Sequence, residues 1–582
     1  MRAKEAVAER DRPIQFGSMP PSTAATRELV VPQPDAPPPQ RVEAQSAQRS
    51  SLTPVRALSL TVPVLLGIAC SVWFITFTLD DPWVTFRYAW QLAHGHGLVF
   101  NPGEHVEGYT NFLWTVIMTG VIKLGGDPLI WAKVIGIALQ SAAVAGVWWC
   151  ARRMLSERIG LSPVALDLLA GLAATTYAIF FFAAMWSAAA LETPLFTALL
   201  VAALAAFLTR RLALAAVVLF LAAITRPEGL LLFGAFAVVV LLTEWRGHRL
   251  SLRTAAAAIL PFAAPFAAFV AWRVAYYGSL LPNTYYDKTG GSLAENLDKG
   301  LAYAGSFAAN LVGIADGVPQ PQFRVRNSIF VLLALAAVGL AAVLYAAWVR
   351  RRGVALALAW LITNVLYAVY EGGDWMPVYR FLVPAMPFLV LAAWAVVGEG
   401  YRAIATRGGP RRRPLAVGLV GVAALAALGA SSAQVQATYA QIGWLRPVTE
   451  DHDIRPNDSY FALAQWLHSH LAPGSLVAIE EAGLVPYFNE QLSFLDLFGL
   501  TDKHLARAPG EPPFGKQDNT YVLSRAPRYA VLWIIKDGSG TMTWAPHLSL
   551  LEDPRFRAQY VRIGVVPRGA GSDFWIFERS GA

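Results

Sequence analysis

The sequence predicts a mainly α, polytopic membrane protein with a smaller α/β domain at its C-terminus. Hydrophobic residues make up 55% of the 582 residues and charged residues only 15%, which is the composition of a membrane protein. Apolar runs long enough to cross a bilayer recur between residues 56 and 435. Beyond about Pro447 the apolar runs are short and mixed with polar residues, so a separate domain outside the membrane is expected at 445–582.

Residues 1–55 are expected to form a disordered tail in the cytoplasm. The segment is rich in Pro, Ala, Gln, Ser and Arg, and a run such as PQPDAPPPQ cannot bury enough apolar surface to fold. This charged tail is also longer than the basic start of a secretory signal peptide. The apolar run 57–78 is therefore expected to be an uncleaved first span.

About eleven spans are expected within a transmembrane domain at 56–435. Each Arg cluster in a short loop is placed in the cytoplasm, where positive loop charge gathers. The loop 79–128 then stays outside, and its apolar segment 112–124, which is too short for a full span, becomes a helix on the outer face. An odd number of spans puts the N-terminus in the cytoplasm and the C-terminus outside. The expected spans are 57–78, 129–150, 166–187, 193–209, 211–225, 228–244, 254–273, 327–349, 353–371, 380–398 and 414–431.

Charge and cysteine usage exclude several function classes. The net charge of +8 comes with Arg clusters in loops and without a nucleic-acid-binding motif, so no nucleic-acid partner is expected. Cys70 and Cys150 fall in expected spans, which excludes a disulfide framework and a cysteine zinc site. His94 and His96 stand two residues apart before a Gly-Leu turn and are poorly arranged as ligands. No metal site is assigned and no cofactor is certain, although a divalent cation stays open.

Asp80 and Asp81 are the candidate catalytic residues. They directly follow the first span, so a helix that enters from the cytoplasm brings the negative end of its dipole to two adjacent acids. At least one of the two carboxyls should therefore have a raised pKa, which suits a general base that takes a proton from a hydroxyl. The alternative is a solvated helix end followed by Pro82, without a chemical role.

Further ionisable and polar residues fall on the same predicted face. Unrelated surface residues would not sort in this way, and ionisable groups that converge from several helices at a membrane boundary indicate a pocket. The candidates for binding a donor phosphate or a substrate are Arg87, Glu107, Glu192, Arg226, Glu228, Asn283, Tyr285, Lys288, Asp374 and Arg380.

Structural roles compete with binding at several of these positions. Arg226 and Glu228 could pair with each other beside the proline between them. Glu192 could mark a helix start, because an acid offsets the positive end of the helix dipole. Arg380 could reach lipid head groups. Arg87 lies on the polar side of an amphipathic helix expected near residues 83–94, where it could face a donor phosphate or anchor the helix to anionic lipid.

An ordered series of motifs carries a family resemblance. The Asp pair is followed by RYA, G-x-G-LVFNPGE and VEGYTN, and later by ALETPLF (190–196), TRPEG (225–229), YYGSLLPNTYY (276–286) and GGDWMPVYRFLVP (372–384). Over about 57–400 this series resembles the GT-C membrane glycosyltransferases, in particular the branch with the terminal arabinofuranosyltransferases of the mycobacterial cell wall. The resemblance implies a GT-C-like fold, a polyprenyl-phosphate sugar as donor, and an acid of the first outer loop as base. By motif, that role falls on Asp80 and Asp81.

The function predicted on these grounds is an integral-membrane glycosyltransferase of the bacterial cytoplasmic membrane. It would transfer a hexose or pentose from a polyprenyl-phosphate donor to a glycan or glycolipid acceptor of the cell envelope, in cell-wall biogenesis. Nucleotide sugars are cytoplasmic, so an outer site needs a sugar activated on a membrane lipid, and no Walker A loop or dinucleotide turn is present. A transporter or flippase of lipid-linked sugars is the alternative, although it should place charges at bilayer depth and show repeated halves. A non-catalytic envelope-assembly protein is a third.

The C-terminal segment predicts a small α/β fold. A helical pattern at 458–471 is followed by short apolar strands near Leu476–Ile479, Leu492–Leu497, Tyr529–Ile535 and Phe574–Phe577. The turns AGLVPYFN and DLFGLTDKH between them could contact an acceptor glycan, or could close the sheet against the membrane domain.

Overall fold

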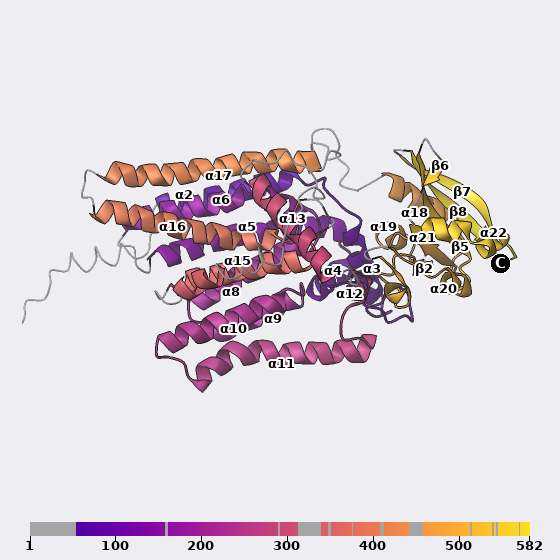
Figure 1. The fold of residues 1–582 in the computed structure, drawn as a ribbon, viewed down its shortest axis with the longest axis horizontal. Coiled ribbons are helices and arrows are strands. Elements are labelled where there is room, and N and C mark those ends of the chain that lie inside the picture. Colours follow the sequence, from indigo (N-terminus) through magenta and orange to yellow (C-terminus); the bar gives the residue numbers. More distant parts are fainter. Residues whose placement is uncertain are drawn as a thin grey trace, which may run out of the picture. The chain divides into compact units, whose positions relative to one another are not determined.

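The structure is a computed structural model, shown in Figure 1. All described residues belong to one unit of the fold, Thr53–Ala582. The predicted tail at 1–55 lies outside them except for its last two positions. The structure describes residues 54–156, 161–288, 292–311, 339–346, 351–374, 376, 378–407, 412–441, 458–511, 515–537, 540–542, 545–569 and 571–581.

The described chain up to residue 441 is built from helices, and Figure 1 shows the long ones running side by side. Several have clear sequence signals at their ends. The Ser162 hydroxyl accepts the N–H of Ala165 at the start of one helix, and Gly278, with a φ of 70°, ends another. The helices are α2 (Pro54–Trp73), α3 (Asp81–Ala93), α4 (Phe112–Lys123), α5 (Pro128–Ser156), α6 (Pro163–Ala178), α7 (Phe181–Ala188), α8 (Thr193–Leu208), α9 (Leu212–Ala223), α10 (Gly229–Arg246), α11 (Leu252–Tyr277), α12 (Asn283–Lys288), α13 (Leu293–Leu311), α15 (Arg352–Tyr370), η1 (Val383–Ala385), α16 (Met386–Arg407) and α17 (Arg413–Gln441).

The chain is a polytopic membrane protein, as predicted. Among the described residues, seven helices are long and apolar enough to cross a membrane, and the bent pair of α6 and α7, which meet at 59°, makes eight. Two further expected spans are the helices α8 and α9, with 16 and 12 residues. The span expected at 327–349 lies mostly outside the described residues. The predicted number of eleven therefore requires both short helices and that segment.

Charged residues gather at the two ends of these helices. Near the end of α10, the Glu244 carboxylate accepts hydrogen bonds from Arg210 Nη1 at 3.0 and 3.2 Å and lies 3.8 Å from Arg352 Nη1. Arg210 follows α8 and Arg352 begins α15, so these helices share this end. Glu192 and Glu228, which directly precede α8 and α10, therefore lie at the opposite end of the helices.

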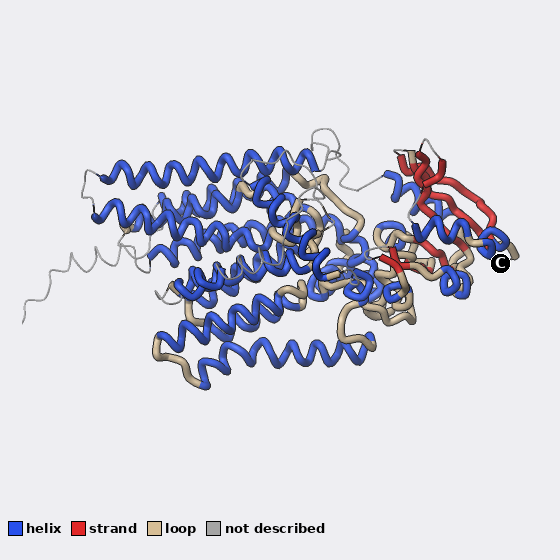
Figure 2. The backbone as a smooth tube through the Cα atoms, in the orientation of Figure 1, coloured by secondary structure: helices blue, strands red, loops and turns tan. Residues whose placement is uncertain are grey.

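The C-terminal part is an α/β domain, and Figure 2 shows its strands in red. Its main sheet has the order β2-β1-β5-β8-β7, with β6 paired to β5. The sheet is mixed, because β1 runs parallel to β2 and β5 whereas β8 is antiparallel to β5 and β7. The elements are α18 (Asp458–His470), β1 (Leu476–Ile479), α19 (Leu484–Tyr487), β2 (Ser493–Asp496), η3 (Leu505–Arg507), β3 (Gly510–Glu511), β4 (Gly515–Lys516), α20 (Asn519–Ser524), β5 (Tyr529–Asp537), β6 (Gly540–Met542), α21 (Ala545–Glu552), α22 (Pro554–Gln559), β7 (Tyr560–Gly569) and β8 (Ser572–Arg579).

The predicted fold class, mainly α with a C-terminal α/β domain, is confirmed. The expected helix at 458–471 is α18, and the four expected strands are β1, β2, β5 and β8. Strand β7 was not predicted. It is an edge strand, and its apolar residues Val561, Ile563 and Val565 are exposed. The alternation of apolar residues along it therefore does not correspond to a buried face.

The C-terminal domain and the loop 79–128 share one hydrophobic core. Trp83 and Phe86 of α3 belong to the same buried cluster as Leu463 of α18, Val477 of β1 and Val485 of α19. The ring centroids of Trp83 and Tyr487 are 5.0 Å apart. The amphipathic helix expected near residues 83–94 is thus a buried helix that packs against the C-terminal domain. This difference arises because the partner of its apolar side comes from a segment about 400 residues later in the chain.

Candidate active site

The Asp pair lies in the turn that connects α2 to α3. Helix α3 begins at Asp81 with Pro82 in its first turn, where a missing N–H leaves no hydrogen bond unmade. The Asp80 side chain does not cap this helix. Its carboxyl reaches the C-terminal domain instead, where Oδ1 accepts the N–H of Leu484 at 2.7 Å. Both Asp residues are partly buried.

Asp80 has the electrostatic environment of a general base. Burial raises its pKa from 3.8 to about 7, and the charge of Asp81 adds to the rise. The N–H groups of Leu484 and Gly483 and the charge of Arg568 lower the pKa in the opposite direction. Because the residue is only partly buried, its carboxyl can exchange a proton with a bound hydroxyl or with water. A carboxyl that titrates near neutral pH matches the requirement of a base that works at that pH.

Asp81 faces a different set of groups. Burial raises its pKa, whereas the positive charges of Arg380 and Lys288 lower it. The negative charge of Asp374 raises it again. The two adjacent carboxyls therefore have different neighbours. Asp80 contacts the C-terminal domain, whereas Asp81 lies near cations of the transmembrane domain.

Arg380 is held by the loop between α15 and α16. Its Nε and Nη2 atoms donate to the two carboxylate oxygens of Asp374 at 2.8 and 3.2 Å. Between these two residues the chain takes an unusual path, because Val378 and Tyr379 have φ values of 62° and 55°, where only glycine is comfortable. The Trp186 indole N–H donates to the Val378 carbonyl at 2.8 Å and supports this turn. Left-handed conformations at such bulky residues are typical of functional sites.

Arg226 forms the centre of a buried network beside Arg380. Its Nη1 lies 3.1 Å from Glu192 Oε1, and its Nε lies 2.5 Å from Glu228 Oε1. Asn111, from the first loop, donates to the other Glu192 oxygen at 3.0 Å. The pairing of Arg226 with Glu228, which the sequence allowed as a purely structural role, is present. The same network also includes Glu192 and Asn111, which come from separate segments.

The two arginines meet at one aromatic ring. The guanidinium carbons of Arg226 and Arg380 each lie 5.3 Å from the centre of Phe381. Lys288, at the end of α12, is exposed and close enough to lower the pKa of Asp81. The structure thus brings together seven of the residues that the sequence singled out: Asp81, Glu192, Arg226, Glu228, Lys288, Asp374 and Arg380.

Arg87 lies outside this cluster. The side chain is buried, and its guanidinium donates to the carbonyls of Phe100 at 2.9 Å, of Leu492 at 3.1 Å and of Pro486. Neither a donor phosphate nor a lipid head group can reach a guanidinium in this position. Arg87 instead joins α3 to the C-terminal domain, which corrects both roles that the sequence allowed.

Glu107, Asn283 and Tyr285 also have other partners. Glu107 lies 2.6 Å from Arg273 Nε, and burial raises its pKa to about 7 in spite of that charge. The Asn283 amide donates to three backbone carbonyls within residues 499–502, so it connects α12 to the C-terminal domain. Tyr285 is exposed.

The turn between β1 and α19 contributes groups to this site that were not predicted from the sequence. Gly483 and Leu484 touch the Asp80 carboxyl, and Glu481 is a second acid beside it. Burial raises the pKa of Glu481, and the charges of Asp80 and Glu480 raise it further. Two adjacent acids directly after a short apolar strand were the available signal, and they resemble the Asp pair after the first span.

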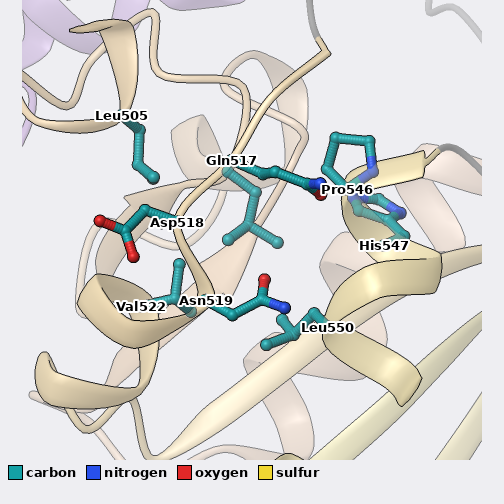
Figure 3. Close-up of a pocket in the computed structure, with 9 residues that line it drawn as sticks. Leu505, Gln517, Asp518, Asn519, Val522, Pro546, His547 and Leu550 are labelled. Atoms are coloured by element: carbon teal, nitrogen blue, oxygen red, sulfur yellow. The ribbon is translucent and has the colours of Figure 1, made fainter. Parts of the chain in front are cut away.

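The described residues contain no group of three or more His, Cys, Asp or Glu side chains arranged to hold a metal ion. A small pocket lies within the C-terminal domain (Figure 3), and none of the predicted site residues lines it. One of its walls is His547, a buried residue whose Nε2 lies 2.8 Å from Glu480 Oε2. The lining residues are Leu497, Leu505, Gln517, Asp518, Asn519, Val522, Pro546, His547 and Leu550.

Comparison with known proteins gives a family match for the C-terminal domain only. Residues 446–577 match a family model described as Domain of unknown function (DUF8728). A search of curated proteins found no match.

Among solved structures, the chain is similar to ArnT from Cupriavidus metallidurans. The crystal structure bound to undecaprenyl phosphate is 15% identical with a TM-score of 0.48, and the alignment covers 89% of this chain and 97% of that one. The apo structure is 15% identical with a TM-score of 0.49, and covers 89% and 98%. A likeness at this level identifies neither a substrate nor a catalytic residue. Neither structure is described as an arabinofuranosyltransferase, so that narrower resemblance stays a prediction.

Proposed function

We propose that this chain is an integral-membrane glycosyltransferase that transfers a sugar from a polyprenyl-phosphate donor to a glycan or glycolipid acceptor. One observation carries the proposal: an acid pair with a raised pKa lies beside Arg380 and Lys288, at one end of a set of membrane-spanning helices. Transfer from a lipid phosphate needs a base for the acceptor and cations for the phosphate, and these are the groups present.

The cations are suited to a phosphate on a lipid. Arg380 is positioned by Asp374 through two hydrogen bonds, so its planar guanidinium keeps a fixed orientation toward an anion. Lys288 is exposed and can follow the phosphate as the ester bond breaks. Arg226 is already neutralised by two carboxylates, so it is not expected to bind the donor. It packs instead on Phe381, the same ring that Arg380 contacts.

In the reaction, Asp80 accepts the proton of the acceptor hydroxyl. The hydroxyl oxygen forms a bond to the anomeric carbon of the donor sugar, and the bond between that carbon and the phosphate oxygen breaks. The lipid phosphate leaves with the electron pair, and Arg380 and Lys288 stabilise its added negative charge. Asp81, whose pKa these two cations lower, is oriented toward the phosphate side of the site, whereas Asp80 is left for the acceptor.

The site is proposed to face the outside of the bacterial cytoplasmic membrane. The opposite end of the helices carries Arg210 and Arg352, and positive loop charge marks the cytoplasmic side. An enzyme on the outer face has no access to nucleotide sugars, which accounts for a lipid-linked donor and for an acceptor in the cell envelope. The N-terminus then lies in the cytoplasm and the C-terminal domain outside.

The test is sugar transfer by the purified full chain in lipid nanodiscs, supplied with polyprenyl-phosphate sugars and envelope acceptors. We expect transfer by the wild type and a loss of about 10² to 10⁴ in kcat for Asp80→Asn, with donor binding retained. Asp127→Asn is a matched control, because Asp127 is exposed and caps α5 through Oδ1, which asparagine preserves. A chain that moves labelled donor across liposomes without any transfer would be a flippase instead.

A further inference from the structure

The C-terminal domain reaches the Asp pair through a single turn. This turn, residues 480–484, runs from the end of β1 to the first residue of α19, Leu484, whose backbone N–H donates to Asp80 Oδ1 at 2.7 Å. The partners are 404 residues apart in sequence. The turn is therefore the place where this domain meets a residue of the proposed chemistry.

Gly483 is required there by space. A Cβ atom at this position would lie 2.1 Å from Asp80 Oδ2, 2.3 Å from Cγ and 2.4 Å from Oδ1. The φ of Gly483 is −99°, so a left-handed backbone is not the reason for the glycine. Any side chain at 483 would push the Asp80 carboxyl away from the Leu484 N–H, because real Cβ atoms do not approach other atoms so closely.

The turn is fixed on both sides of this contact. Trp83, three residues after Asp80, packs against Phe488 with ring centres 5.1 Å apart and ring planes tilted by 48°. Arg87, one helical turn further along α3, donates to the carbonyls of Pro486 and Leu492. Because helix α3 and the turn are tied by these contacts, the position of the Leu484 N–H relative to Asp80 is set by rigid elements and not by the loop alone.

A second carboxyl completes the surroundings of Asp80. The groups that act on Asp80 and Glu481 are Asp81 on α3, Glu480 in the turn, Tyr460 on α18 and Arg568 on β7. The pKa of Glu481 is raised, with Asp80 as the first charge that raises it. The turn that binds Asp80 therefore also carries a buried acid on which the charge of Asp80 acts.

We infer that the turn at residues 480–484 completes the active site: the Leu484 N–H and the space at Gly483 position the Asp80 carboxyl. These are positioning residues, since they act through Asp80. This role belongs to the domain whose family has no known function, and it rests on the proposed glycosyl transfer. The C-terminal domain is then part of the catalytic unit and not an appendage for acceptor capture.

The kinetic test is Gly483→Ala in the full chain. We expect kcat to fall about 10²-fold with an unchanged Kd for the donor, because a base displaced by about 1 Å loses its alignment while the cations stay in place. Gly305→Ala in α13 is the matched control, since a Cβ there meets no atom within 4 Å. Wild-type kcat in Gly483→Ala would overturn the inference.

A second measurement separates the turn from the proposed chemistry. Hydrogen exchange at Leu484 should speed up in Asp80→Ala but not in Asp80→Asn, which keeps an accepting oxygen, nor in Asp81→Ala. If Gly483→Ala alone is poorly folded, the same substitution should be tolerated in an Asp80→Ala background, because the carboxyl that clashes with the new methyl group is absent there. Unchanged exchange in Asp80→Ala, or equal damage by Gly483→Ala in both backgrounds, would show that the turn does not hold Asp80. If the wild type transfers no sugar, the proposed function fails while these two results still decide the contact.

Discussion

The pH dependence of sugar transfer follows from the state of Asp80. Its pKa is raised from 3.8 to about 7, mainly by burial, and a base works only when ionised. The rate should therefore be full above the raised pKa and should be lost as the pH falls through it. With a single base of this pKa, about 90% of molecules are active at pH 8 and about 1% at pH 5, so kcat should fall about 90-fold between these two values.

The assay measures kcat of the purified chain in nanodiscs from pH 4.5 to pH 9 at saturating donor and acceptor. A diester phosphate in the donor does not titrate in this range, so the limb reports the enzyme. The residual rate of Asp80→Asn should be flat with pH, whereas Asp127→Asn should keep the wild-type limb. A limb centred near pH 4 would mean that Asp80 is an ordinary solvated carboxyl. A limb near pH 7 that survives in Asp80→Asn would assign the titration to another group.

Three further perturbations test separate parts of the structure. Arg226→Met leaves two buried carboxylates without their cation and should destabilise the chain by about 3–5 kcal/mol in detergent unfolding; neutralising both partners with Gln should restore most of that loss. Arg380→Lys loses the bidentate geometry and should weaken donor binding about tenfold by calorimetry, with the unfolding midpoint little changed. A reporter fused after Gly125 should read external and one after Gly247 cytoplasmic, and the reverse would place the proposed site on the wrong face.

Hydropathy alone was sufficient to predict the apolar helices of the membrane domain, whereas the less apolar helix α13 was not predicted. Each described segment that was expected to span is helical, with 166–187 divided between α6 and α7, because a bilayer requires apolar segments with internally satisfied backbones. The side on which Arg210 and Arg352 fall was also enough to group Glu192 and Glu228 at one end. Both inferences use properties of single segments, which a sequence displays directly.

Contacts between distant segments were not predictable in the same way. The spacing of Trp83, Phe86 and Arg87 correctly predicts a helix, but not what covers it. The pattern is equally compatible with a lipid surface and with a protein partner, and the structure shows that residues near 486–492 cover it. Glu481 was missed for the same reason: an acid after a strand is ordinary until the residue opposite is known.

The choice between Asp80 and Asp81 as the base illustrates what only the structure can add. The two residues are identical in type and adjacent in sequence, so no local pattern separates them. The fold gives Asp81 the cations Arg380 and Lys288, which favour its ionised form and are also the groups that a phosphate would bind. It gives Asp80 a backbone donor that fixes its orientation, and burial raises the pKa of Asp80 to about 7. In the proposed mechanism the base lies on the side of the anomeric carbon away from the leaving phosphate, so we assign the acceptor proton to Asp80, the residue turned away from the cations.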